Sequence, residues 1–468
     1  MLPVVLAAMF MAQFDLYVVN VAAPSLEHDI HAGPAALQLI VAGYGFTYAA
    51  GLITGGRLGD LFSHRRMFLF GVLAFGAASV LCGISQTSGE LVAARLLQGL
   101  TGAAMVPQVL AMITASFPAA ERARALAWFG VTIGVGAVAG QVLGGLLLEA
   151  NILGLGWRAI FLVNAPVGLA AAAFAYRLLP RREKPARRPR LDPLGAVGIA
   201  LSLALALVPL VLGRSDGWPV WAWVSLAASA PVMLASVYWE RALARRGGQP
   251  MLDMTLFVNR MFVRGLLVNV TIFSAFFSFV FVLTLVLQSG LGLSPLQAGL
   301  TFTPLGLAFA AASIIAQRMV PKYGATVILT GTGLVIIGIV ALILELRLSG
   351  AATSAPRLIG PMVLIGLGNG TAVPALIGSV LAGARAKDAG AAAGVLTTSQ
   401  QFASAAGVAA VGSIFFAALG GGHSLGSFTS ALQWVAVVDL VLVVIAASLA
   451  TRLPRPARTA AQASKAGA

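Results

Sequence analysis

Long runs of apolar residues, separated by short polar segments, dominate the chain. Runs of about 20 residues match a helix that crosses the hydrocarbon core of a bilayer. The runs lack the alternation of polar and apolar residues that marks membrane β-barrels. The pattern predicts an all-α membrane protein with 14 transmembrane helices, at 3–24, 36–56, 67–86, 91–116, 124–148, 158–179, 193–213, 219–239, 262–288, 295–317, 325–346, 357–381, 390–418 and 429–451.

The basic residues between these runs separate onto two sides. With the N-terminus in the cytoplasm, 25 of the 30 Lys and Arg residues lie in or beside cytoplasmic segments. The outer loops hold Arg158, Arg214, Arg347 and Arg357, and Arg95 lies within a span. Cytoplasmic loops carry such an excess of basic residues. We therefore expect both termini in the cytoplasm. This orientation explains the net charge of +15 better than nucleic-acid binding does.

The composition agrees with a membrane protein. The chain is 59% hydrophobic and 10% charged, whereas soluble domains carry about 25% charged residues. Cys82 is the only cysteine, which excludes a disulfide or a cysteine metal site within the chain. Residues 1–24 lack a basic n-region and contain an acid, so we interpret them as the first span and not as a removable signal peptide.

Two charged residues lie deep inside the predicted spans of the first 180 residues. Asp15 is in the first span and Arg95 is in the fourth. A charge at mid-bilayer costs about 2.5–3.5 kcal/mol on insertion scales, so such groups usually face a cavity or a partner and serve a function. We predict that Asp15 takes up and releases a proton. The alternative is a hydrogen bond to a neighbouring helix. For Arg95, a structural clamp and a role in coupling remain open.

An internal repeat divides the chain. G-L-T-G-A-A-M-V-P from Gly99 resembles G-L-G-N-G-T-A-V-P from Gly366, and the same offset of 267 residues relates Glu121 to Asp388, Gly140 to Gly407 and Gly145 to Gly412. Parallel repeats place a binding site between two halves near the midplane. The predicted parts are an N-terminal six-helix half (1–180), a basic linker with a two-helix insert and an interfacial segment (181–260), a C-terminal six-helix half (261–452) and a cytoplasmic tail (453–468).

Several kinds of activity find no support in the motifs. The chain has no G-x-x-x-x-G-K-[ST] phosphate loop, no H-E-x-x-H and no G-x-S-x-G, so ATP-driven transport and enzyme chemistry are not indicated. E-H-D-I-H (27–31) is interpreted as ordinary loop residues and not as a metal site. No filter-like loop suggests a channel. We expect no cofactor and no metal, with a proton gradient as the energy source.

Five segments together resemble one known family. They are F-D-L-Y-V-V-N-V-A-A-P (14–24), G-G-R-L-G-D-L-F-S-H-R-R (55–66), L-V-A-A-R-L-L-Q-G (91–99), G-A-V-A-G-Q-V-L-G-G (136–145) and W-R-A-I-F-L-V-N-A-P-V-G (157–168). They resemble motifs of the major facilitator superfamily, and in particular of its fourteen-span drug/proton antiporters. Leu61 and Ser63 stand where that family usually has Arg and Gly, and Gln141 stands where it usually has Pro.

The resemblance implies the major facilitator fold and efflux of small organic, cationic or amphipathic compounds in exchange for protons. It implies proton coupling by Asp15 and Arg95, and gating by Gly56, Asp60, Arg65 and Arg66. A small-residue face allows close helix packing and comprises Gly136, Gly140, Gly144 and Gly145. Candidates to line a substrate cavity, with packing as the alternative, are Gln13, Asn20, Met105, Gln108, Gln141, Asn269 and Asp439. Asp439 is the other acid deep in a span, and we consider it as a second, substrate-specific acid.

The expected partners are a small-molecule substrate, protons and the lipid bilayer, with no nucleic acid. The expected protein is a monomer in the bacterial cytoplasmic (inner) membrane. Two other functions remain open. The chain could export a metabolite, lipid or natural product on the same fold, or serve as a non-transporting sensor. A substrate assay separates the first from drug efflux, and the absence of proton-coupled flux would mark the second.

Overall fold

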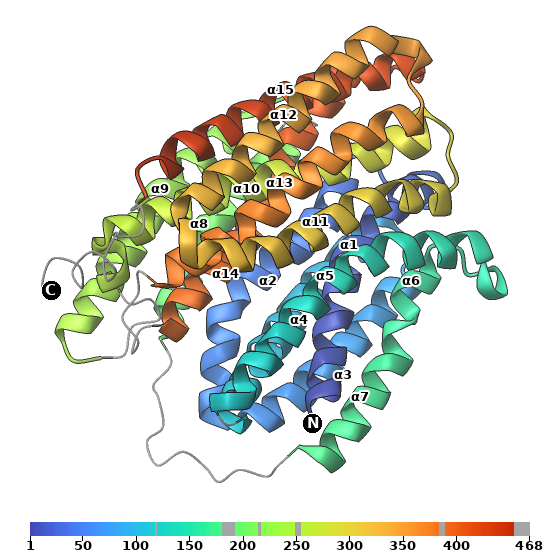
Figure 1. Ribbon diagram of the computed structural model, residues 1–468. Helices are drawn as coiled ribbons and strands as arrows, with labels where there is room; N and C mark the ends of the chain where they lie inside the picture. Colours follow the sequence, from blue (N-terminus) through green and yellow to red (C-terminus); the bar gives the residue numbers. More distant parts are fainter. Residues whose placement is uncertain (118, 180–191, 214–216, 249–253, 383–388, 454–468) are drawn as a thin grey trace, which may run out of the picture.

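The computed structural model describes residues 1–117, 119–179, 192–213, 217–248, 254–382 and 389–453, and its regular elements are helices (Figure 1). Fourteen helices among these residues are long and apolar enough to cross a membrane, which confirms the predicted number. The first half comprises α1 (Leu2–Asp29), α2 (Pro34–Phe62), α3 (His64–Ile84), α4 (Ser88–Ser116), α5 (Ala119–Ala150), η1 (Ile152–Gly154) and the sixth span, which is built from α6 (Arg158–Leu162) and α7 (Asn164–Leu178).

The two-helix insert consists of α8 (Pro193–Leu212) and α9 (Val220–Arg245). The second half comprises η2 (Met254–Val258), α10 (Arg260–Leu285), the π-helical turn η3 (Val286–Gly290), α11 (Pro295–Tyr323), α12 (Ala325–Ser349), η4 (Gly350–Ala352), α13 (Ala355–Ala382), α14 (Ala389–Leu419) and α15 (Leu425–Ala450). The basic linker at 180–191, residues 249–253 at the start of the predicted interfacial segment and the tail from 454 lie outside the described residues.

Several helices extend past the apolar runs that predict them. The first ends at Asp29 and not at 24, and α2 continues to Phe62 although its apolar run ends at 56. Hydropathy marks only the part of a helix that suits hydrocarbon, whereas backbone hydrogen bonding continues into polar flanks. The segment 55–66 is therefore not an extended loop. It is helical on both sides of Ser63, which has φ 82° and ψ 129°.

The internal repeat has a structural counterpart. The fourth span, α4, packs against α2 and α3, as α13 packs against α11 and α12. A Cβ added at Gly99 would overlap the Tyr44 carbonyl of α2, and one at Gly366 would overlap the Leu305 carbonyl of α11. In the same way, a Cβ at Gly140 would overlap the backbone of α1, and one at Gly407 would overlap the backbone of α10. The repeated glycines thus meet equivalent helices, as the offset of 267 residues predicts.

The two halves meet along α2 with α14 and along α5 with α11. Side-chain hydrogen bonds between described residues join them near the end of the bundle that carries the turns at 30–33, 150–157 and 290–294. Gln288 Nε2 donates to the Val21 carbonyl (2.8 Å), Ser294 Oγ donates to Glu149 Oε2 (2.9 Å), and Ser413 Oγ donates to Gln38 Oε1 (3.3 Å). We call this end the closed end and the opposite one, which carries most of the basic residues, the basic end.

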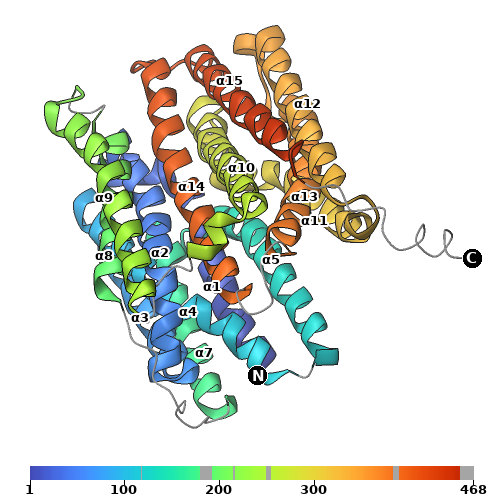
Figure 2. The same ribbon diagram turned by 90° about the vertical axis from the view of Figure 1, so that its left-hand side faces the viewer.

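Toward the basic end the two halves spread apart. In Figure 1 the helices of the two halves lie close together at the right and separate toward the lower left. Figure 2 shows α8 and α9 on one flank of the bundle, beside α2 and α14. The insert contacts both halves, because α8 packs on α2 and α14, and Ser413 Oγ donates to the Leu210 carbonyl (3.0 Å).

The close approach at Gly407 leads to a stability prediction. Replacing Gly407 by leucine forces α14 away from the Ser274 backbone of α10, and we expect a loss of about 1–3 kcal/mol, as for other overpacked cores. The measurement is the thermal unfolding midpoint of purified protein in detergent. Gly394→Leu is the matched control, since a Cβ at Gly394, on the same helix, meets nothing within 4 Å. Equal losses in the two variants would contradict the prediction.

Candidate functional site

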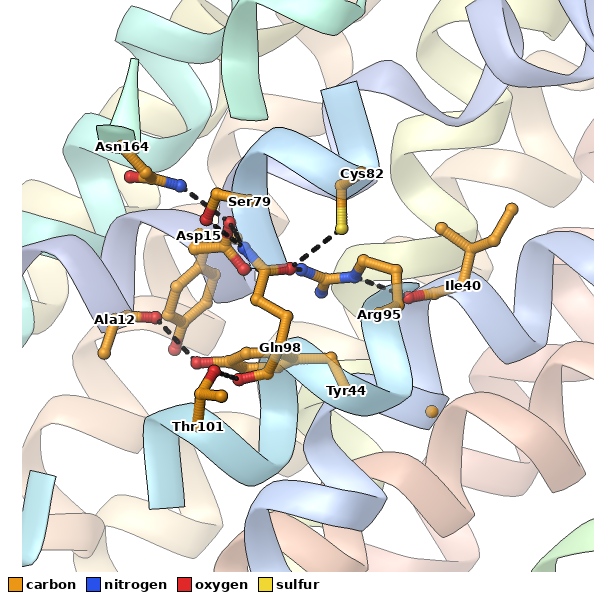
Figure 3. Close-up of polar contacts among 12 residues, drawn as sticks. Ala12, Asp15, Ile40, Tyr44, Ser79, Cys82, Arg95, Gln98, Thr101 and Asn164 are labelled. Carbon is orange, nitrogen blue, oxygen red and sulfur yellow. Dashed lines mark hydrogen bonds and ion pairs between the residues drawn. The ribbon is translucent and has the colours of Figure 1, made fainter. Parts of the chain in front are cut away.

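Asp15 and Arg95 form a buried ion pair inside the N-terminal half. The helices α1 and α4 bring them together, with Arg95 Nη1 2.5 Å from Asp15 Oδ2 and neither side chain exposed (Figure 3). Removing two charges from water is unfavourable unless each is paired and hydrogen-bonded. The ion pair explains how the bundle tolerates both charges at membrane depth.

Neutral donors complete the shell around the carboxylate. Gln98 Nε2 donates to Asp15 Oδ1 (2.8 Å) and also to Ser79 Oγ (2.7 Å). Asn164 Nδ2 donates to the same Asp15 oxygen (3.0 Å). Four spans therefore meet at Asp15: α1, α3, α4 and the one formed by α6 and α7. One cation and two amide donors therefore provide partners for the charged form of the carboxylate.

The guanidinium of Arg95 has partners of its own. Its Nε donates to the Ile40 carbonyl (3.0 Å) and its Nη1 donates to Gln98 Oε1 (2.6 Å). The Tyr44 ring lies under it at 4.4 Å from the centroid, and the Phe161 ring lies at 5.7 Å. Aromatic faces attract a cation most strongly where water is absent. Arg95 thus keeps several contacts that do not depend on the charge of Asp15.

The residues predicted for this site did not include Gln98, Asn164, Ser79 or Tyr44. Two of them stand in the segments that carried the resemblance. Gln98 is three residues after Arg95, so both side chains leave the same face of α4, and Asn164 is the first residue of α7. That spacing is a usable signal for Gln98. The role of the other three depends on which helices pack together.

The segment 55–66 connects four helices at the basic end. Gln108 of α4 donates through Nε2 to the Gly55 carbonyl (2.7 Å), and its Oε1 accepts from His64 Nδ1 (2.8 Å). A Cβ at Gly59 would overlap that amide. Asp60 Oδ1 lies 3.4 Å from His64 Nε2, so its nearest ionisable partner is the histidine. Gln108, a candidate for the cavity, is in fact fully buried in this region.

The predicted gating residues differ in their surroundings. Arg65 Nη2 donates to the Tyr176 carbonyl (2.6 Å) and its guanidinium lies 5.3 Å from the Tyr176 ring, which joins α3 to α7. Arg66 is exposed. Gly56 is half-buried, and a Cβ there would lie 3.8 Å from Pro107. The segment is therefore anchored mainly within the N-terminal half in this conformation.

The four glycines of α5 pack against two different helices. Cβ atoms at Gly136, Gly140 and Gly144 would collide with Gln13, Tyr17 and Val18, so this face packs closely on α1. Gly145 points elsewhere, against the Leu296 backbone of α11 in the other half. Close packing is the role that small residues at this spacing usually have.

The remaining cavity candidates are all buried. Met105 packs at Gly71 of α3, Gln13 packs at Gly136, and Asn20 Nδ2 donates to the Tyr17 carbonyl (3.3 Å). Gln141 differs from the other candidates in its hydrogen bonding. It is 5% exposed, and within the described residues neither end of its amide has a hydrogen-bond partner. Its backbone lies against Gly299 of α11, at the junction of the two halves.

The second half holds two further candidates. Asn269 joins α10 to α14, since its Nδ2 donates to Ser399 Oγ (2.9 Å) and its Oδ1 accepts from Gln400 Nε2 (3.1 Å). Asp439 of α15 accepts from Ser278 Oγ of α10 (2.9 Å) and is 1% exposed. In the part of the chain that the structure describes, no group of three or more His, Cys, Asp or Glu side chains is placed to hold a metal ion.

Comparisons with known proteins agree with this architecture. A family model described as the Major Facilitator Superfamily matches residues 5–408. The probable actinorhodin transporter of Streptomyces coelicolor is 37% identical over 420 residues, which cover 90% of this chain and 72% of that protein. The puromycin resistance protein pur8 of Streptomyces alboniger is 34% identical over 418 residues, which cover 88% of this chain and 81% of that protein.

Among solved structures, a bacterial homologue of the human lysosomal transporter Spinster, in an inward-facing and unoccupied conformation, superposes with a TM-score of 0.70. The match covers 96% of this chain and 95% of that chain at 16% identity. At this identity the likeness concerns the fold alone.

Proposed function

Because the chain belongs to the Major Facilitator Superfamily, we propose that it exports small organic compounds across the bacterial cytoplasmic membrane in exchange for protons. The family and its fold are those that the motifs implied. The proposal includes a monomeric transporter that is not an enzyme and needs no cofactor. Relatives named for antibiotic transport and for drug resistance support export.

The observation that carries the proton coupling is the buried Asp15–Arg95 pair. A carboxyl group sealed at membrane depth is costly to keep unless it serves a function. Asp15 is the only acid of the N-terminal half that the structure shows without any exposed surface. In its paired state it has released its proton, because the charged form accepts the Arg95 and Gln98 donors.

The geometry supports a simple cycle. With the basic end in the cytoplasm, as the excess of basic residues favours, the halves are apart on the cytoplasmic side and in contact on the outer side. The conformation is then an inward-facing one with a deprotonated Asp15, ready to take substrate from the cytoplasm. After the halves rock and expose the outer side, a proton enters, neutralises Asp15 and frees it from Arg95. The return of the protonated form brings the proton inward.

A second candidate is export of an antibiotic that the cell itself makes. The relative named as a probable actinorhodin transporter favours it. Both candidates use the same proton chemistry and differ in substrate range. A cell that lacks this protein would accumulate its own product under the second function. Under the first it would become sensitive to several added drugs.

The proposed function is tested with purified protein in liposomes under an imposed pH gradient. We expect loading of structurally different drugs, driven by protons moving in the opposite direction, and no loading when the gradient is collapsed. Protein-free liposomes control for passive drug partitioning along the pH gradient. Uptake that ignores the gradient but responds to added ATP would contradict the proposal.

A further inference from the structure

A second buried carboxyl group lies inside the C-terminal half. Asp439 of α15 lines a small cavity together with residues of α10, α12 and α13. The lining is apolar apart from Asp439 and Asn369, and it includes Phe276 and Phe279 of α10. The cavity lies within one half of the bundle and not between the halves.

The two oxygens of this carboxyl group have different surroundings. Oδ1 accepts the Ser278 hydroxyl at 2.9 Å, whereas Oδ2 is buried and, within the described residues, has no hydrogen-bond partner. The amide nitrogen of Asn369 donates to its own helix, at the Ile365 carbonyl (3.0 Å). No salt bridge reaches Asp439 among the described residues, in contrast to Asp15. The orphaned oxygen is where a proton would sit.

The charged groups of the surrounding helices are near helix ends. Arg260 and Arg264 are in the first turns of α10, and Arg264 Nη1 donates to the Arg452 carbonyl (3.0 Å). Glu345 and Arg347 are near the end of α12, and Glu345 Oε1 pairs with Arg357 Nη1 of α13 at 3.8 Å. The described residues of α14 carry no charge. Among the described residues no cation pairs with Asp439, and an unpaired negative charge in such a site is far costlier than a neutral, protonated acid.

One turn of α10 connects this acid to the junction of the halves. Ser278 binds Asp439, and Phe276 lines the cavity. Between them, the ring of Phe277 lies 5.4 Å from that of Tyr17 on α1, two residues from Asp15. A change of charge at Asp439 therefore acts on the turn that carries a contact between the halves.

From this geometry we propose that Asp439 is a second proton-binding site, enclosed in the C-terminal half and coupled through the turn 276–278 to the contact between α10 and α1. It is not a residue that touches substrate. The proposal rests on the proton coupling proposed above and adds a second proton to the transport cycle.

Infrared difference spectroscopy of purified protein tests the site directly. We expect the acid-minus-alkaline spectrum of the wild type to contain a carboxylic acid C=O band that Asp439→Asn lacks. Glu345→Gln, the same acid-to-amide change on a neighbouring helix, retains the band. Ser278→Ala keeps the carboxyl group but removes its donor, so it shifts the band. A spectrum that Asp439→Asn leaves unchanged would overturn the proposal.

Transport then tests the coupling. With one proton fewer per cycle, a gradient of one pH unit sustains about tenfold less substrate accumulation. Asp439→Asn in liposomes should show this loss, and Glu345→Gln should not. Equal accumulation by wild type and Asp439→Asn would overturn the second proton. If the wild type ignores the pH gradient, the proposed function fails, whereas the infrared band still reports whether Asp439 binds a proton.

Discussion

Asp15→Asn is expected to abolish proton-driven export while exchange of substrate for substrate continues. Asparagine is nearly isosteric with aspartic acid and carries no charge, so it imitates the protonated state permanently. The carboxylate is the charge that Arg95 holds in this conformation. Without a group that ionises at position 15, a proton no longer breaks the pair with Arg95, and a proton at Asp439, in the other half, does not replace that step. In liposomes with a pH gradient, accumulation should fall to that of protein-free liposomes, and counterflow with substrate on both sides should persist.

The matched control for this variant is Asp29→Asn. Asp29 is the last residue of the same helix and its side chain is partly exposed, paired with His28. This control should transport like the wild type. The counterflow measurement shows that Asp15→Asn is folded and binds substrate. Wild-type rates of proton-driven export by Asp15→Asn would show that Asp15 is not the proton carrier.

Arg95→Met is expected to unfold the protein or to lower its stability by about 3–5 kcal/mol, as the breaking of other buried ion pairs does. Methionine fills much of the same volume but leaves the Asp15 carboxyl group without its cation, with only the Gln98 and Asn164 amides as donors. The Ile40 carbonyl also loses the Arg95 donor. The measurement is the amount of monodisperse protein and its thermal midpoint in detergent.

A double variant separates this electrostatic cause from simple loss of packing. Asp15→Asn combined with Arg95→Met removes both charges, so most of the lost stability should return, because replacing a whole buried pair is often close to neutral. Proton-driven transport should not return. The exposed Arg347 provides the control, since Arg347→Met removes an arginine from the end of α12 at little cost. If the double variant were as unstable as Arg95→Met, the charge imbalance would not be the cause.

The hydrophobic pattern was sufficient for the number of spans, because crossing a bilayer imposes a minimum apolar length. It was insufficient for the ends of the helices. The apolar run of α2 ends at 56, whereas the helix continues to Phe62 through the segment 55–66, one of the five that resemble family motifs. The Ser63 backbone, with φ 82°, also explains why glycine suits that turn, since glycine adopts positive φ without strain.

The sequence was sufficient to predict which charged residues are buried, but it predicted only some of the groups that pair with them. An acid and an arginine in apolar runs have to find compensation, which is why Asp15 and Arg95 stood out. Their direct pairing, and the contribution of Asn164, depend on the packing of α1 against α4 and α7. Gln108 was a candidate to line the cavity, with packing as the alternative. In the structure its buried amide donates to the Gly55 carbonyl and accepts from His64.

The sequence by itself determined the membrane class, the fourteen spans, the repeat and the family, because each depends on local composition or on short motifs. The tertiary structure alone decided which charges are compensated. Among the described residues, Asp15 has a cation and two amides around it, whereas Asp439, in an equally apolar run, has one hydroxyl donor to Oδ1 and none to Oδ2. The energy of a buried charge depends on groups within a few ångströms, and those groups come from helices far apart in the chain.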